Sequence, residues 1–240
     1  MALSVKVALW AVVATWGLGL ELARIPASAV LAQTVPDGLL GTENSVVTRQ
    51  GDRDLVSGGA TRGSRLFHSL LELNVGEGRS LFFVNPEGIA QILGRVTGDK
   101  PSDIFGTLGV LGDADLFLLN PNGILFGPNA QLAIAGSFLA STGDRFTFAD
   151  GTSFSAVNPE PNALLTISVP TGLQLGANPG AIVNRSRANG VGLAIAPGQT
   201  LALVGGEISL DGGQSRRILG GLNSSRFRIK PWNCAQMIKD

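Results

Sequence analysis

The sequence predicts an all-β fold, and three observations favour a parallel β-helix among the all-β architectures. From residue 80 to residue 211, apolar runs of four to seven residues are separated by Gly, Asn, Asp or Pro, the pattern of short strands and turns. Several runs are almost continuously apolar instead of alternating, as strands in stacked parallel sheets are. The segments 165–186 and 193–213 have the cadence of coils of about 20 residues. A β-sandwich and a closed barrel are the other architectures that such short strands permit.

Residues 1–32 have the features of a cleaved secretory signal. Lys6 provides a short basic region, residues 7–20 form an apolar run that is short for a membrane-spanning helix, and small residues follow. We expect cleavage after Ala32, with Ala29 as the second choice, and an uncleaved anchor is the alternative. The signal would direct the chain to the Sec translocon.

The stretch from residue 33 to residue 63 mixes short β-branched runs with Gly, Asp and Asn, as a capping strand with its loops would. Residues 64–80 follow, and periodicity alone does not decide between a short helix and a buried strand there. We predict an extended segment, because Asn74 and the glycines that follow end the apolar run at a length that is marginal for a helix.

No segment of the central region sustains the periodicity of an independent helix. Residues 33–212 contain no Trp or Tyr, and ten Phe lie between Phe67 and Phe154. Because Phe buries a large area without a polar group to satisfy, we expect an interior ladder of Phe and no aromatic platform for sugars. The predicted strands lie, in order, in 80–84, 88–96, 103–111, 114–119, 123–127, 130–136, 137–141, 145–148, 163–169, 172–176, 181–186, 190–196, 200–206 and 207–213.

Two segments of strand, turn and strand are similar to each other, SLFFVNPEGI at 80–89 and DLFLLNPNGI at 115–124, 35 residues apart. Pro presets the first corner of a turn, an Asn side chain can bond to the backbone two residues on, and Gly accepts conformations that other residues avoid. Repeated units of this kind suggest a stack in which each coil buries the face of its neighbour.

Charge divides the chain into two unlike parts. Residues 33–212 carry ten Lys and Arg against sixteen Asp and Glu, whereas residues 213–240 carry six against one. The acidic part argues against nucleic acid as a ligand. The single cysteine, Cys234, excludes an internal disulfide. We interpret 33–212 as the domain and 213–240 as a divergent basic tail from a truncated or frameshifted reading frame.

Residues 34–212 resemble the filamentous haemagglutinin N-terminal domain of large secreted bacterial exoproteins, also called the haemagglutination activity or two-partner secretion domain. The resemblance rests on NPNGILFGPNAQL (120–132), LFHSLLELNVGEGRSLFFVNPEGI (66–89) and ILGRVTGDKPSDIFGTLGV (92–110). It implies a right-handed, single-stranded parallel β-helix with an N-terminal cap and short antiparallel hairpin elements.

The resemblance also singles out residues of the two turns as a recognition and secretion motif. The family's NPNG motif falls on Asn120, Pro121, Asn122 and Gly123, and its other motif, often NPNL, falls on Asn85, Pro86, Glu87 and Gly88. The departure at positions 87 and 88 keeps the turn but puts in doubt any role of the missing Asn and Leu side chains. Whether the turns contact a partner or only shape the corners stays open at this point.

The function that the resemblance implies is that of a secretion address, not of an enzyme. Such a domain crosses the inner membrane with a signal peptide, and an outer-membrane β-barrel partner with periplasmic POTRA domains then recognises and exports it. The chain would reach the cell surface or the medium, where a longer cargo would give adhesion, haemagglutination or cytolysis. The sequence does not identify a host-cell or surface ligand.

The sequence offers few of the residue combinations that catalysis needs, so we predict no catalytic residues, no metal site and no cofactor. His68 is the only histidine, which removes most triads and metal sites. Two acidic pairs with a spacing of two residues could face one way on a strand, and we expect them to be solvated turn acids: Asp52 with Asp54 and Asp113 with Asp115. We expect Arg95 to be solvated or to pair with the cap.

Two other functions stay as alternatives. A β-helical polysaccharide-active enzyme would need a cluster of carboxylates and basic residues on adjacent coils. A self-associating surface or matrix protein would assemble with increasing concentration through an open coil end.

Overall fold

The computed structural model describes residues 33–160, 165–168, 170–211 and 215–216. The predicted signal at 1–32 and nearly all of the predicted basic tail at 213–240 lie outside these residues. Within the described part, no helix has the length and apolar character needed to span a membrane.

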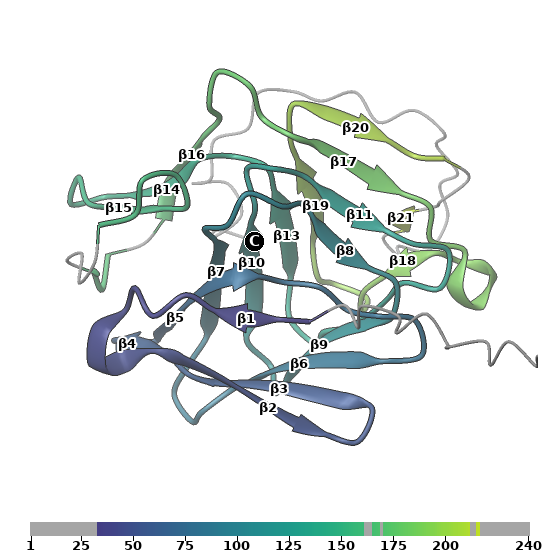
Figure 1. Cartoon of the computed structure of the whole chain (residues 1–240), viewed down its shortest axis with the longest axis horizontal. Coiled ribbons are helices and arrows are strands. Elements are labelled where there is room, and N and C mark those ends of the chain that lie inside the picture. The colour runs from purple at the N-terminus through teal and green to yellow at the C-terminus, as the bar shows by residue number, and fades with distance from the viewer. Residues whose placement is uncertain (1–32, 161–164, 169, 212–214, 217–240) are drawn as a thin grey trace, which may run out of the picture. The chain divides into compact units, whose positions relative to one another are not determined.

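The chain winds into a parallel β-helix of about 6 turns, as predicted, with strands on three faces (Figure 1). Each full coil visits face B, then face A, then face C. Face A contains β5 (Arg65–Glu72), β7 (Gln91–Val96), β10 (Asp115–Leu119), β13 (Phe138–Ser141) and β19 (Leu201–Val204). Face B contains β3 (Arg53–Gly58), β6 (Ser80–Val84), β9 (Thr107–Leu111) and β12 (Gln131–Ala133). Face C contains β8 (Ser102–Ile104), β11 (Ile124–Phe126), β17 (Ala181–Asn184) and β20 (Glu207–Ser209).

Antiparallel strands cap the N-terminal end of this coil stack. β1 (Val35–Pro36) and β4 (Ala60–Arg62) pair with β5, and β2 (Ser45–Gln50) pairs with β3. A short 3-10 helix, Gly41–Glu43, lies between β1 and β2. The predicted cap at 33–63 and the predicted extended segment after it are both confirmed.

The coils are longer than the sequence cadence predicts. On face A, Arg65 pairs with Gln91 and Gln91 with Asp115, so successive coils differ by 26 and 24 residues, and Leu116 pairs with Phe138, 22 residues on. The expectation of about 20 residues was too short because each coil carries three strands and three corners.

The interior of the coil stack is one apolar core. Because side chains alternate between the two sides of a strand, every second residue of each face points inward. These interior residues include Leu66, Ile92, Leu116, Phe138 and Leu108, all of which are buried.

A three-stranded antiparallel sheet leaves the coil between β13 and β17 and covers the outer side of face A. It consists of β14 (Arg145–Phe148), β15 (Ser153–Ser155) and β16 (Pro170–Gln174), in the order β15-β14-β16. Phe67 of face A contacts Phe148 and Phe154 of this sheet edge to face, with ring centroids 6.1 and 5.1 Å apart. A second apolar core therefore lies outside the coil.

This second core explains two features of the sequence. The strands of face A read as continuous apolar runs because both of their sides are buried. The expected interior ladder of Phe is only partly correct, since Phe83, Phe126 and Phe138 lie inside the coil, whereas Phe67, Phe146, Phe148 and Phe154 belong to the outer core.

The remaining elements complete the described part. β18 (Leu193–Ala194) pairs parallel with β21 (Ser215–Arg216), and a second 3-10 turn spans Ala188–Gly190. The strand predicted at 163–169 is wrong for residues 165–168, which form no strand; residues 161–164 and 169 lie outside the described part. The other predicted strand segments each contain a strand.

Candidate recognition turns

The NPNG turn lies between β10 and β11, at the corner where face A meets face C. The backbone N–H of Gly123 donates to the carbonyl oxygen of Asn120 at 3.2 Å and closes the turn. The side-chain Oδ1 of Asn120 accepts from the backbone N–H of Asn122 at 3.0 Å. This is the local bond that an Asn before a turn is expected to make.

Asn120 itself lies inside the protein, with no exposed surface. Its Nδ2 donates to the carbonyl oxygen of Lys100 at 3.1 Å and to Oγ of Ser102 at 2.9 Å, both in the preceding coil. Its backbone N–H donates to the carbonyl oxygen of Ser141 in the following coil at 2.9 Å. Asn120 therefore ties three consecutive coils together at one corner.

The solvent side of this turn is formed by Pro121, which is half-buried, and Asn122, which is exposed. Nδ2 of Asn122 donates to the carbonyl oxygen of Gly98 at 2.7 Å, which holds the exposed side chain in place. Gly123 has φ +125°, and a Cβ there would lie 3.1 Å from the carbonyl oxygen of Ala181. Position 123 thus requires glycine both for its conformation and for its space.

The second turn lies between β6 and β7, where face B meets face A, and it is built differently. It closes one residue later, since the backbone N–H of Ile89 donates to the carbonyl oxygen of Pro86 at 3.3 Å. Asn85 is half-buried; with its amide oriented to match its neighbours, Nδ2 donates to the Ile89 carbonyl at 3.1 Å and Oδ1 accepts from the N–H of Ala114 at 3.2 Å. Pro86, Glu87 and Gly88 are exposed.

The structure does not bring the two turns into one patch. The Asn85 turn lies at the edge of face A where its strands begin, whereas the Asn120 turn lies at the opposite edge, where they end. The width of face A separates them, roughly 17 Å for a strand of five residues. The stack of coils that the repeat suggested is confirmed, but 35 residues is not its period: β6 and β10 lie on different faces, and the same turn sequence serves two different corners.

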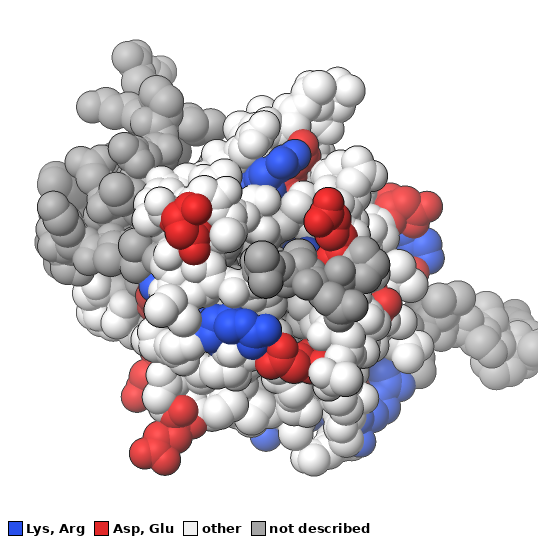
Figure 2. Space-filling model, turned by 90° about the vertical axis from the view of Figure 1, so that its left-hand side faces the viewer, with Lys and Arg blue, Asp and Glu red and all other residues white. Residues whose placement is uncertain are grey.

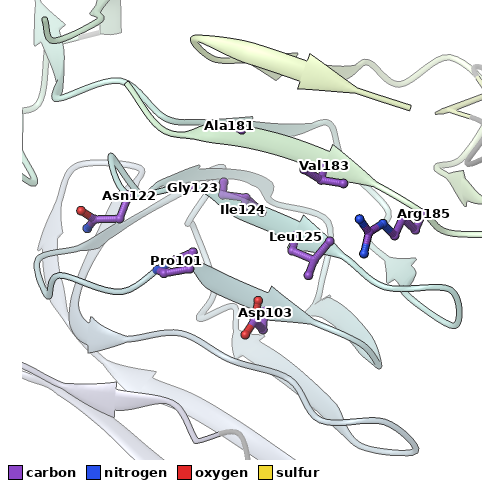
Figure 3. Close-up of a pocket in the computed structure, with 9 residues that line it drawn as sticks. All are labelled: Pro101, Asp103, Asn122, Gly123, Ile124, Leu125, Ala181, Val183 and Arg185. Carbon is purple, nitrogen blue, oxygen red and sulfur yellow. The ribbon is translucent and has the colours of Figure 1, made fainter. Parts of the chain in front are cut away.

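A shallow pocket opens on the outer side of face C, directly beside the NPNG turn (Figure 3). Its cavity volume is about 270 Å³, and its walls come from β8, β11, β17 and the turn. Asp103, Leu125 and Val183 occupy paired positions on the three strands. Sequence reasoning missed these residues, although the outward positions of 103, 125 and 183 follow from strand alternation once the register is known.

His68 is a structural residue on the inner side of face A. It is fully buried; Nδ1 lies 3.0 Å from Oγ of Ser45, while Nε2 has no hydrogen-bond partner among the described residues. Burial lowers the pKa of His68 to about 4, so the ring is neutral at physiological pH. Among the described residues, therefore, only one of its two ring nitrogens has a hydrogen-bond partner.

Arg95 is buried under the outer sheet, which corrects the expectation of a solvated side chain. Its Nε donates to Oγ of Ser69 at 2.7 Å, and Nη1 donates to the carbonyl oxygen of Ser155 at 2.8 Å. The guanidinium lies 4.5 Å from the ring centroid of Phe154. Burial lowers the pKa of Arg95 to about 10, and Asp37 of the cap opposes this, so the group stays charged at neutral pH.

The predicted turn acids divide into two kinds. Asp52 and Asp113 are exposed as expected. Asp54 is buried and pairs with Arg49 at 2.9 Å and Arg79 at 3.1 Å; burial raises its pKa, but the two arginines outweigh this and lower it. Asp115 is half-buried and accepts from the N–H of Ser137 at 2.7 Å, and burial raises its pKa.

Asp54, Arg49 and Arg79 form the kind of cluster of acidic and basic residues that a β-helical polysaccharide-active enzyme would need. These three side chains are paired with one another at the end of the β2–β3 hairpin. In the part of the chain that the structure describes, no group of three or more His, Cys, Asp or Glu could hold a metal ion. Among the described residues on the face shown in Figure 2, acidic and basic side chains are interspersed and form no continuous basic patch of the kind that binds nucleic acid.

The fold is that of a parallel β-helical domain, and two of its corners are turns that begin with Asn-Pro, at Asn85 and at Asn120. Residues 32–238 match the family model of the TPS secretion domain, in which TPS stands for two-partner secretion, so the chain belongs to this family. Its members are non-enzymatic secretion domains of exoproteins that cross the outer membrane with an outer-membrane transporter as partner. The recognition of a two-partner secretion domain from sequence is confirmed.

Two solved structures are similar to this chain. The HMW1 secretion domain from Haemophilus influenzae is 19% identical with a TM-score of 0.45, and the match covers 74% of this chain and 40% of that chain. The filamentous hemagglutinin secretion domain is 16% identical with a TM-score of 0.41, and the match covers 77% of this chain and 99% of that chain. Comparison with curated proteins gave no match.

Proposed function

We propose that residues 33–212 act as the secretion address of an exoprotein and that the POTRA domains of an outer-membrane β-barrel partner recognise them in the periplasm. Residues 1–32 bring the chain to the Sec translocon and are removed. The exported chain then reaches the cell surface or the medium. Adhesion or haemagglutination is the output when a longer cargo follows the domain.

The single observation that carries this proposal is the match of residues 32–238 to the secretion-domain family. Two further features support it. The N-terminal residues combine a basic start, an apolar run and small residues before the domain. The carboxylate of Asp54 is buried and is occupied by its own ion pairs with Arg49 and Arg79.

For the two turns, we propose different contributions. Asn120 supports recognition from the inside, because its amide holds the corner in shape and has no exposed surface. The exposed residues Asn122, Pro86 and Gly88, together with the half-buried Pro121, are the ones that a partner can touch. Gly123 and Asn85 set their geometry.

Export is the experiment that tests this function. The chain is expressed with and without the candidate partner barrel, and the medium is assayed for the processed chain by immunoblotting and N-terminal sequencing. Appearance in the medium only with the partner, with a start at residue 33, supports the address and the signal. Retention of a folded chain in the periplasm with the partner present contradicts the secretion address, and a mature chain that starts at Met1 contradicts the cleavage.

A further inference from the structure

The outer side of face C differs from those of the other two faces. Face A is covered by the outer sheet of β14, β15 and β16. On face B the ring of Phe82 is covered by the guanidinium of Arg53, 4.9 Å from the ring centroid. On face C the outward residues leave a hollow beside Leu125, because Gly123, two residues before it, has no side chain to fill the space next to Pro101. No described segment covers this hollow.

The walls of the hollow are mostly apolar. Pro101, Leu125, Ala181 and Val183 line it, and Asn122 of the NPNG turn stands at one end with Arg185 at the other (Figure 3). The volume of about 270 Å³ is below the roughly 300–1,000 Å³ of small-molecule sites. The space therefore suits one long side chain better than a whole organic ligand.

Asp103 places a carboxylate at the edge of this apolar wall. It is half-buried, and burial raises its pKa, so its charge is poorly solvated. Within residues 33–160, 165–168 and 170–211, its carboxylate makes no ion pair and accepts no side-chain hydrogen bond. Arg185, which also lines the pocket, pairs with Asp211 at 3.4 Å, and Lys100, which precedes Pro101 in the chain, pairs with Glu72 at 2.7 Å.

A desolvated carboxylate beside apolar surface is complementary to a lysine or arginine side chain. The aliphatic stem of such a side chain covers apolar surface, while its charged end reaches an acid. A carboxylate without an ion pair inside its own chain is stabilised most by a cation that a binding partner supplies.

We propose that this pocket is the site on which the partner's periplasmic domain docks, through a lysine or arginine whose stem lies on Pro101, Leu125 and Val183 and whose charged end pairs with Asp103. This inference rests on the proposed function, since the occupant belongs to the outer-membrane partner. It names the surface and the chemistry of recognition.

The pocket also links the buried motif residue to the surface. Asn120 fixes the turn, the turn places Asn122 and Gly123, and these two residues form one end of the pocket. Any side chain at position 123 would point toward Pro101 and Ala181 and fill the space. Loss of the Asn120 amide would thus weaken docking by deforming the pocket, without any direct contact between Asn120 and the partner.

Binding and export of four variants test the proposal. The full chain is purified, and its binding to the POTRA-containing region of the candidate partner is measured by calorimetry at 50 and 500 mM NaCl. Asp103→Asn and Leu125→Arg alter the pocket. Asp52→Asn and Leu111→Arg are the matched controls, because both residues are exposed and lie on other parts of the surface. Thermal melts of all variants establish that they fold.

We expect Asp103→Asn and Leu125→Arg to bind about tenfold more weakly or worse, and to be exported less, while both controls behave as the wild type does. High salt should weaken the wild type more than Asp103→Asn, since the variant lacks the charge pair. Normal binding and export of both pocket variants would overturn the pocket while leaving the secretion address intact. A wild-type chain that neither binds the partner nor depends on it for export would overturn the proposed function as well.

Discussion

The two turns share the letters Asn-Pro and a glycine, yet they do different work. At the corner of faces A and C, Asn120 is fully buried and bonds to the coil before it and the coil after it. At the corner of faces B and A, Asn85 is half-buried and bonds within its own turn and to Ala114 of the following coil. The coil before that corner belongs to the capped end, where the chain passes from β3 to β4.

The comparison shows that the structural role of a turn motif in a coil stack depends on which coils lie next to it. The side chain of Asn120 bonds to the coil before its corner, and its backbone N–H bonds to the coil after it, so the residue links three coils. The side chain of Asn85, near the cap, bonds to the coil on one side only. Four measurements can break or sharpen this contrast.

The largest effect is expected for Asn120→Ala. The substitution leaves the carbonyl of Lys100, the hydroxyl of Ser102 and the N–H of Asn122 without their partner in a buried place, which should cost about 3 kcal/mol. Urea unfolding of the purified chain measures the loss. A loss below about 1 kcal/mol would show that the amide is not the link between coils that the structure indicates.

The glycines of the two turns allow a paired comparison. Gly123→Ala meets both a positive φ and a nearby carbonyl, and we expect a loss of about 2 kcal/mol. Gly88→Ala meets a positive φ but open space, so about 1 kcal/mol is expected. Denaturation curves of the two variants in parallel measure the difference, and equal losses would remove this distinction between the corners.

Lowering the pH should reduce the free energy of unfolding through His68 and not through Asn85 or Asn120, because a side-chain amide does not titrate. His68 has a folded pKa of about 4 against an ordinary value of 6.5, so the unfolded chain binds more protons between these values. Its stabilising contribution is complete above the unfolded pKa and is lost as the pH falls toward the folded one, by about 2 kcal/mol between pH 7 and pH 5. Unfolding free energies across this range test the slope, which His68→Gln should flatten and Asn120→Ala should leave unchanged.

The smallest effects are expected at the second turn. Asn85→Ala removes bonds to two carbonyls and one N–H at a half-buried place, for about 1 kcal/mol. Glu87→Asn restores the residue that the family motif often has there, and because Glu87 is exposed the change should stay within about 0.5 kcal/mol. If either variant destabilises the chain as much as Asn120→Ala does, the contrast between the turns disappears.

The sequence was sufficient for the class of fold and for most strands, because short apolar runs between Gly, Asn and Pro have few other solutions. It also indicated the cap. The resemblance implied short antiparallel hairpin elements, and β14, β15 and β16 are such elements. Their place over face A was not indicated, because Phe residues that fill an interior and those that join two layers look alike along the chain. The buried state of Arg95 follows from that layer and was missed with it.

The site was predictable only in part. The local bond from Asn120 to Asn122 follows from turn chemistry, whereas the bonds to Lys100, Ser102 and Ser141 depend on coil lengths that vary from 22 to 26 residues on face A. The pocket of Asp103, Leu125 and Val183 combines three strands whose register no local pattern specifies. The pairing register between strands far apart in the chain is the feature that is hardest to predict from a single sequence.

The cap gives the stack a direction. A further coil joins by extending a parallel ladder, but the strands at the N-terminal end run antiparallel, and the outermost of them, β2, presents polar residues such as Thr48 and Gln50. Two molecules therefore cannot continue each other's ladders through this end, which protects crowded, newly emerged chains from fusing into fibres. In the language of polymers, the N-terminal end of the stack is a terminated end.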